Sequence, residues 1–221
     1  MTQLKVSRRY VVFGALALAG CGESKLARTV IDAYQLAIVG RPDVPISRST
    51  VTNLPYASIA AKIGKGPKSL LILWRQDRGD LHWLSADDAA IVTRNGRIVK
   101  TAGLPETLLE TRSLSTDPVG AGLESGNQNT IYLREVDLSP PPQFGLLIES
   151  KIREIGPRTI SIADIEFDTV LFYEHCTART LNWSFTNRYW VDPADGFVWR
   201  SEQTIARGFP PIEVEILKPA A

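Results

Sequence analysis

From residue 57 onward the chain is a succession of short strand-like segments, and this pattern limits the possible fold more than any other feature. β-Branched and aromatic residues fill the segments, whereas Gly, Pro, Asn and Asp gather between them. Helices do not alternate with strands, so a parallel sheet is not indicated. The pattern predicts a mainly β fold: a strongly curved antiparallel sheet or incomplete β-barrel with one N-terminal helix. The expected strands or hairpins cover residues 57–63, 69–75, 81–85, 89–103, 130–138, 146–155, 159–176, 182–191, 197–206 and 212–217.

Several connections between these segments can be located. Asn95-Gly96 stands between two β-rich runs and predicts a type I′ hairpin turn. The stretch DPADG (192–196) predicts a second hairpin, with Gly196 in the left-handed conformation. Two long strands are expected to meet around Gly156-Pro157, and a change of apolar parity near Ala163-Asp164 predicts a bulge or corner there. Residues 104–128 are polar and are expected to be mostly loop.

One helix is predicted before the strands, over residues 23–40. Leu26, Val30, Ala37 and Ile38 follow helical spacing, and Gly40 lies at the expected end. Residues 41–49 are expected to be a connector. The apolar stripe of the helix is expected to pack on the β domain, with the membrane surface as the alternative.

The first twenty residues have the parts of an export signal. Basic residues precede an apolar stretch over residues 10–18, which is shorter than the roughly 20 residues that span a bilayer. Leu18-Ala19-Gly20-Cys21 resembles the bacterial lipobox, which implies that Cys21 is acylated and becomes the first residue of the mature protein. A plain signal peptide before a coincidental cysteine is the alternative. Several acyl chains would anchor the protein stably.

These features predict a division into three parts. Residues 1–20 are the signal peptide, residues 21–56 are the lipidated N-terminus with its helix and connector, and residues 57–221 are the antiparallel β domain. Gly22 after the lipobox favours the outer membrane, because aspartate at that position is typical of retention at the inner membrane. Arg8-Arg9 also resembles a twin-arginine signal, so the general and the twin-arginine export routes both remain open.

Charge argues against a nucleic-acid partner. Of the 25 basic residues, Lys5, Arg8 and Arg9 lie in the signal, which leaves 22 basic and 24 acidic residues and a net charge of −2. No segment of the remaining chain forms a basic patch.

Candidate catalytic groups are few. The sequence has two histidines, His82 and His175, without the spacing of a metal site. Cys176 follows His175, and neighbouring residues of a strand point to opposite faces, so a buried structural thiol is expected rather than a nucleophile. The acidic groups lie in turns or alternate with apolar residues; they are Asp87/Asp88, Asp164/Glu166/Asp168 and Asp192/Asp195. We therefore expect no catalytic residue, no metal and no enzymatic activity.

Aromatic residues gather in the predicted hairpin around DPADG. Alternation places Trp183, Phe185 and Tyr189 on one face, and Arg188 with Trp190 on the other. Arg188 and Trp190 are therefore the candidate contact for a glycan or a protein partner, with a structural aromatic girdle as the alternative.

Four features together resemble one known family. They are the lipobox at Cys21, LPYASIAAKIG (54–64), TRNGRIVKTAGL (93–104) and NRYWVDPADGFVWRSEQ (187–203). The chain is similar to the YjbF/GfcB family, the group 4 capsule polysaccharide lipoproteins. The resemblance implies a periplasm-facing lipoprotein of the outer membrane, associated with exopolysaccharide or capsule secretion. It carries over one functional position, Cys21, and no catalytic residue.

The sequence therefore favours a non-enzymatic lipoprotein that assists assembly or export of an exopolysaccharide. Its expected partners are an outer-membrane β-barrel exporter, other secretion proteins and the polysaccharide itself, and it contacts the membrane through its anchor. The expected prosthetic group is the covalent lipid on Cys21. Two alternatives remain: a carrier or receptor for lipids or lipoproteins with a half-barrel cavity, and a periplasmic glycan hydrolase using two carboxylates roughly 5–10 Å apart.

Overall fold

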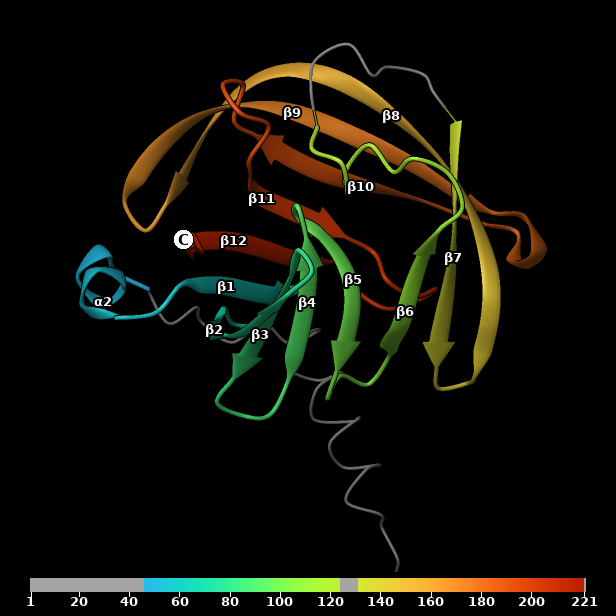
Figure 1. Ribbon diagram of the computed structural model, residues 1–221, viewed down its shortest axis with the longest axis horizontal. Coiled ribbons are helices and arrows are strands. Elements are labelled where there is room, and N and C mark those ends of the chain that lie inside the picture. Colours follow the sequence, from blue (N-terminus) through green and yellow to red (C-terminus); the bar gives the residue numbers. More distant parts are fainter. Residues whose placement is uncertain (1–45, 124–130, 221) are drawn as a thin grey trace, which may run out of the picture.

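The computed structural model describes residues 46–123 and 131–220. Within these residues, twelve strands form one antiparallel sheet in the order β5-β4-β3-β2-β1-β12-β11-β10-β9-β8-β7-β6 (Figure 1). The first and last strands pair in the middle of this order, so β5 and β6 form its two free edges. The strands are β1 Ser58–Ile63, β2 Ser69–Asp77, β3 Asp80–Ser85, β4 Ala90–Arg94, β5 Arg97–Ala102, β6 Thr107–Ser113, β7 Ile131–Ser139, β8 Gln143–Ile162, β9 Ile165–Ala178, β10 Trp183–Val191, β11 Val198–Gln203 and β12 Ile212–Lys218.

The sheet curls until its two edges lie next to each other, which gives a nearly closed barrel. β5 and β6 follow one another in the chain and are in contact, but no backbone ladder joins them. A side chain makes one link across this seam, since the backbone N–H of Leu108 donates to Oγ1 of Thr101 at 2.9 Å. The fold class predicted from the sequence is confirmed.

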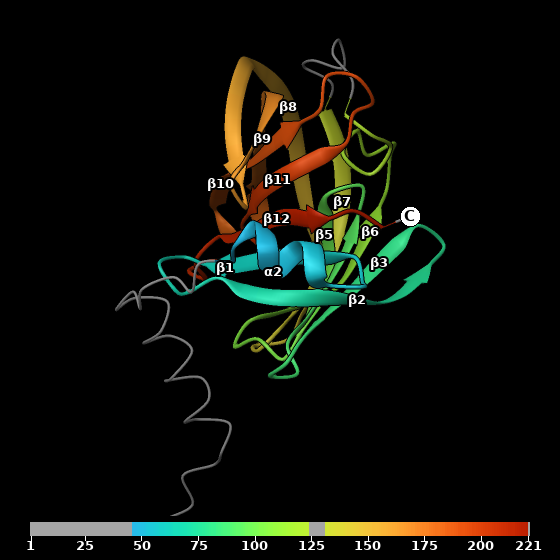
Figure 2. The same cartoon turned by 90° about the vertical axis from the view of Figure 1, so that its left-hand side faces the viewer.

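The helical part differs from the expected one. The predicted helix over residues 23–40, like Cys21 and the export signal, lies outside the described residues. A short helix, α2 (Arg48–Asn53), begins within the expected connector, where the side chain of Ser47 caps it by accepting from the N–H of Thr50. It lies beside β1 and the end of β12 (Figures 1 and 2), where Lys218 Nζ donates to the carbonyl of Leu54 at 2.7 Å. A single 3-10 turn, η1 (Arg179–Leu181), connects β9 and β10.

Both predicted hairpin turns are confirmed. Asn95 and Gly96 have φ of 47° and 85°, as a type I′ turn requires. Glycine is needed at position 96, because a Cβ there would lie 2.5 Å from Cβ of Val198. Gly196 is also left-handed, with φ of 76°.

Two expectations about the long strands were wrong, and both concern β8. The chain continues through Gly156-Pro157 as one strand, with a register shift against β9 between Glu154 and Gly156. Pro157 is tolerated because β7 pairs with β8 only as far as Lys151, which leaves one side of the strand without a ladder partner. The hairpin turn lies instead at Ala163-Asp164, where φ is 47° and 64°. The parity change predicts only a bulge or corner, and left-handed Ala is uncommon, so the residue types at 163–164 do not indicate a hairpin turn.

The segment predicted to be mostly loop contains one strand that was not expected. Residues 107–113 form β6, which pairs with β7 along its length. The sequence TLLETRS lacks regular alternation, because a bulge between Leu108 and Glu110 shifts the pattern by one residue. Residues 107–113 therefore form a strand because they pair with β7, and not because of their own residue pattern.

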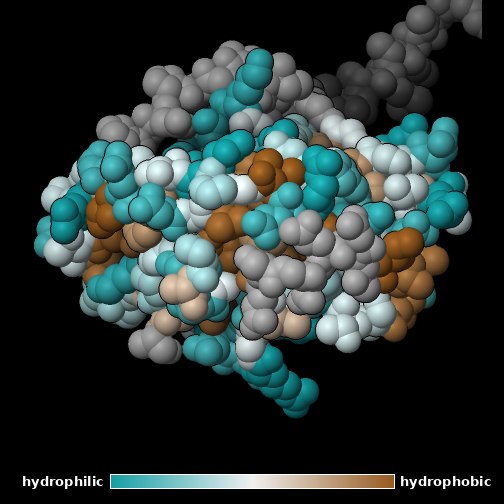
Figure 3. All heavy atoms as spheres, turned by 90° about the horizontal axis from the view of Figure 1, so that it is seen from above, coloured by the Kyte–Doolittle hydropathy of each residue, from teal (hydrophilic) through white to brown (hydrophobic). Residues whose placement is uncertain are grey.

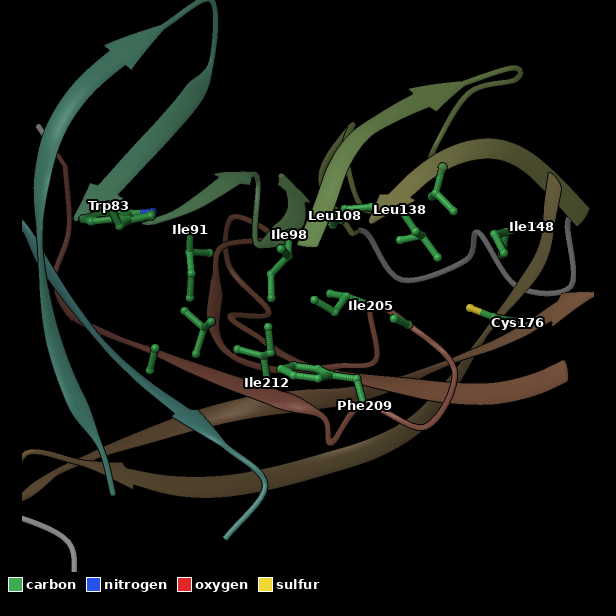
Figure 4. Packing of buried hydrophobic residues seen from close by; sticks show 14 of the residues in the cluster. Trp83, Ile91, Ile98, Leu108, Leu138, Ile148, Cys176, Ile205, Phe209 and Ile212 are labelled. Carbon is green, nitrogen blue, oxygen red and sulfur yellow. The ribbon is translucent and has the colours of Figure 1, made fainter. Parts of the chain in front are cut away.

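The interior of the barrel holds two hydrophobic clusters. Figure 4 shows the larger cluster, in which Trp83, Ile98, Ile148 and Ile212 are buried. The smaller cluster surrounds the aromatic rings of β7, β9 and β10; its buried members are Val119, Leu123, Tyr132, Ile152, Phe172, Tyr189, Val191 and Val198. The expectation of a buried thiol is confirmed, since Cys176 is in the larger cluster and 1% exposed.

The far end of the β8–β9 hairpin folds against the outside of the barrel. Figure 1 shows this end at the left, where it bends down toward the level of β11 and β12. Nη2 of Arg200 donates to the carbonyl of Ser161 at 2.9 Å, and the rings of Phe167 and Trp199 lie 4.1 Å apart. The hairpin end thus covers part of the outer face of β11.

Candidate functional site

A buried carboxylate, Glu174 of β9, is the centre of a polar network inside the barrel. Its side chain is fully buried and accepts hydrogen bonds from five side chains. The donors are Arg134 Nη1 (2.7 Å), Asn187 Nδ2 (2.8 Å), the Tyr189 hydroxyl (2.8 Å), Arg97 Nη2 (3.1 Å) and the Tyr132 hydroxyl. We call these six residues and Asp117 the Glu174 network. Such complete pairing is what a buried charge requires.

Arg97 joins this network to a free edge of the sheet. It begins β5, and its guanidinium binds Asp117 through Nε at 2.5 Å and Nη2 at 2.8 Å. The same group reaches Glu174 on β9, on the far side of the barrel. The two arginines, Arg97 and Arg134, balance Glu174 and Asp117, so the buried charge is neutral. The network therefore holds β5 to strands with which it has no ladder.

Burial and ion pairing keep each of these titratable groups in one protonation state near neutral pH. Burial alone would raise the pKa of Glu174, but the guanidinium groups of Arg134 and Arg97 hold it well below its usual range. Burial raises the pKa of both Tyr132 and Tyr189 well above the usual value. Burial, together with the charge of Glu174, raises the pKa of Cys176 to about 11. None of these groups has the pKa of a general base or a nucleophile at neutral pH.

The depressed pKa of Glu174 predicts how stability depends on pH. In the unfolded chain its pKa is about 4.5, so its stabilisation is fully present above that pH and is lost as the pH falls through the lower folded value. We expect the urea midpoint to change little from about pH 7 to 5 and to fall below pH 4.5. In Glu174→Gln the decrease below pH 4.5 should be smaller. An identical pH profile for the two proteins would contradict this assignment.

A cleft of about 540 Å³ opens at one end of the barrel. Strands β3, β11 and β12 supply its apolar walls, and the β4–β5 turn and the loop before β11 form part of its rim. The larger apolar side chains are Leu81, Trp83, Phe197, Val198, Val214 and Ile216. We call this the end cleft. Its volume lies in the range of small-molecule sites, which is about 300–1,000 Å³.

Arg188 and Trp190 lie on the outer face of β10, on the side that alternation predicted. Both are half-buried and have partners in this chain. Arg188 Nη1 contacts both carboxylate oxygens of Glu202, at 2.8 and 2.9 Å, and the guanidinium of Arg200 lies 5.7 Å from the centre of the Trp190 ring. Their role as a glycan or partner contact remains a prediction. Figure 3 shows that hydrophobic residues on one side of the molecule are separated by hydrophilic ones.

Among the other chemical candidates from the sequence, His175 and Cys176 point to opposite faces, whereas Asp192 and Asp195 line one pocket of about 280 Å³. His175 is exposed, and its Nδ1 lies 3.0 Å from Oγ1 of Thr186, whereas the neighbouring Cys176 faces the interior. Asp192 and Asp195 accept backbone N–H groups within their own turn. Within residues 46–123 and 131–220, no three or more His, Cys, Asp or Glu side chains are grouped as metal ligands. The helices in the same ranges are too short or too polar to cross a membrane.

Comparison with known proteins assigns the chain to a family. The model of the group 4 capsule polysaccharide lipoproteins, GfcB and YjbF, matches residues 31–217. The chain belongs to this family. Two relatives in Escherichia coli K12 are uncharacterized lipoproteins: GfcB is 29% identical over 93% of this chain and 95% of its own length, and YjbF is 27% identical over 83% and 85%.

A solved structure extends the comparison to three dimensions. The family member resembles the crystal structure of the hypothetical lipoprotein YmcC from Escherichia coli K12, with a TM-score of 0.72 and 26% identity. The match covers 90% of this chain and 98% of the other. The resemblance read from the sequence is therefore confirmed, and the barrel is shared with a solved lipoprotein.

The Glu174 network was not predicted from the sequence, although β9 carries a signal for it. Phe172, Glu174 and Cys176 have the same parity, so an acid stands between two residues of the apolar face. An inward acid requires a buried cation. Its partners Arg97 and Arg134 lie on β5 and β7, and only the folded barrel brings these strands together.

Proposed function

We propose that this YjbF-family protein is a non-enzymatic lipoprotein, anchored through Cys21 in the outer membrane, that assists export of a capsule or exopolysaccharide. The match of residues 31–217 to the group 4 capsule polysaccharide lipoproteins is the observation that carries the proposal. It would act in the periplasm beside an outer-membrane β-barrel exporter and other secretion proteins.

The chemistry of the interior favours a role without catalysis. The carboxylates of the Glu174 network are paired with arginines, and the thiol of Cys176 is held protonated. Glycoside hydrolysis uses two carboxylates, and in the described residues the end cleft is lined by one, Asp195. A smaller pocket is lined by both Asp192 and Asp195, but each of these accepts a backbone N–H of its own turn. These features support a binding or assembly protein over a glycan hydrolase.

The outer face of β10 is the proposed contact with polysaccharide or partner. The Arg188–Glu202 pair and the Trp190–Arg200 contact place cations beside aromatic rings on one surface. Flat rings and guanidinium groups of this kind suit contacts with sugars or with an acidic polymer.

Deletion of the gene in its host bacterium tests the proposed role. High-molecular-weight polysaccharide should fall outside the cell and accumulate in the periplasm, and the wild-type gene should restore export. Unchanged polysaccharide in both compartments would overturn the proposal.

The anchor predicts a large effect of Cys21→Ser. The variant should incorporate no labelled fatty acid and should move from the membrane to the soluble fraction, because the loss of several acyl chains removes about 0.8 kcal/mol for each buried methylene. Cys176→Ser is the control, since it changes the other cysteine, which is buried, and should keep the label. Full membrane binding and full export by an unlabelled Cys21→Ser variant would refute the anchor.

A further inference from the structure

The end cleft combines apolar walls with polar side chains, three of which have partners within the chain, while Gln76 of β2 is an exposed polar side chain of the lining. Trp83 Nε1 donates to Thr93 Oγ1 at 2.8 Å, and Asn95 Nδ2 donates to the carbonyl of Gly120 at 2.6 Å. Oγ of Ser201 accepts from Gln203 Nε2 at 2.9 Å. A sugar in the cleft would compete with these internal bonds, since its hydroxyl groups need donors and acceptors.

The charges that line the cleft restrict the class of ligand further. The part of the cleft that the structure describes is lined by no Lys, Arg or His, and its single carboxylate is Asp195 at the rim. A buried phosphate or carboxylate would therefore meet no cation, and burial of an unpaired anion is costly. A hydrocarbon chain, in contrast, needs neither hydrogen bonds nor a counter-charge.

We propose that the end cleft binds one unbranched alkyl chain of a lipid, whose polar head stays at the rim. The volume of about 540 Å³ suits a chain rather than a whole two-chain lipid. The apolar walls from β3 and β12 would replace water around the methylene groups. This proposal does not rest on the proposed role in export.

Binding of alkylphosphocholines below their micelle concentrations tests the proposal, with the full-length chain in a Cys21→Ser background so that no covalent lipid competes. Affinity measured by calorimetry should rise about fourfold with each methylene from octyl to decyl chains, as burial of hydrocarbon requires. Phosphocholine alone should not bind. Binding that is absent, or that does not depend on chain length, would overturn the proposal, as would tighter binding of a neutral oligosaccharide.

Matched substitutions locate the site. Ile216→Trp fills the cleft and should weaken decylphosphocholine at least about tenfold, which corresponds to ~1.4 kcal/mol. Ile72→Trp makes the same change on β2, where the side chain is 37% exposed, and should leave affinity within about twofold. Leu81→Phe on β3 is the second filling variant if Ile216→Trp does not fold. Equal affinity of a folded filling variant and Ile72→Trp would refute the site.

The acylated wild-type protein shows whether the alkyl chain in the cleft comes from a separate lipid or from the lipid on Cys21. If a separate lipid is the natural ligand, the wild type should bind decylphosphocholine as the Cys21→Ser chain does. If the lipid on Cys21 occupies the cleft, binding should be blocked in the wild type and restored by Cys21→Ser. Both results support an alkyl-chain site, whereas weak binding in every form contradicts it.

Discussion

Glu174→Gln should destabilise the protein by about 3–5 kcal/mol, the usual cost of removing one partner from a buried ion pair. The substitution keeps the size of the side chain but leaves Arg97 and Arg134 with Asp117 as the remaining carboxylate of the network. Two buried guanidinium groups then share one negative charge. Since domains of this kind have about 5–15 kcal/mol of stability, the loss is a large fraction of the total. Urea unfolding at pH 7 measures it.

The control for this prediction is Glu149→Gln, which makes the same chemical change in an ion pair at the surface. Arg179, the partner of Glu149, is 76% exposed in its side chain, so the expected loss is about 0–1 kcal/mol. If the two variants lose similar stability, the ion pairs of Glu174 stabilise the barrel no more than an ion pair at the surface does.

Trp83→Ala should cost about 3–5 kcal/mol, as large-to-small changes at buried aromatic positions do. Trp83 is 1% exposed and packs in the larger hydrophobic cluster, at the wall of the end cleft. Its indole N–H also binds Thr93 on the neighbouring strand β4. Truncation therefore removes apolar packing and one buried hydrogen bond together. The change in unfolding free energy from urea melts is the measurement.

Trp74→Ala gives a control of the same residue type on the adjacent strand. Trp74 is 68% exposed on β2, so its removal should change stability by no more than about 0.5 kcal/mol. Equal losses for the two tryptophans would mean that Trp83 is not part of the core. A larger loss for Trp74 would show that its exposed surface is covered in solution.

The interior and the surface of the barrel have different roles in this family member. The interior is held together by hydrophobic clusters and by paired charges. Proposed binding therefore lies at the outer face of β10 and in the end cleft. The two sites are tested separately, because export and alkyl-chain affinity are different measurements.

Turns and strands were predictable where their causes are local. Asn95-Gly96 fixes its hairpin because Asn and Gly adopt positive φ, and the alternation of β10 placed Arg188 and Trp190 on the outer face. Local pattern failed at β6 and at Ala163-Asp164, where pairing with neighbouring strands outweighs residue preference. A strand that forms mainly because a neighbouring strand pairs with it does not show the full residue pattern of a strand in its own sequence.

The mainly β class, the hairpin turns at Asn95-Gly96 and at residues 192–196, and the family could be read from the sequence, because each depends on residues close together in the chain. The tertiary structure decided the order of the strands, the seam between β5 and β6, and the Glu174 network. Arg97 and Glu174 are 77 positions apart, and no local pattern pairs them. They meet because closure of the sheet buries both, and a buried charge is stable in the fold only beside its opposite.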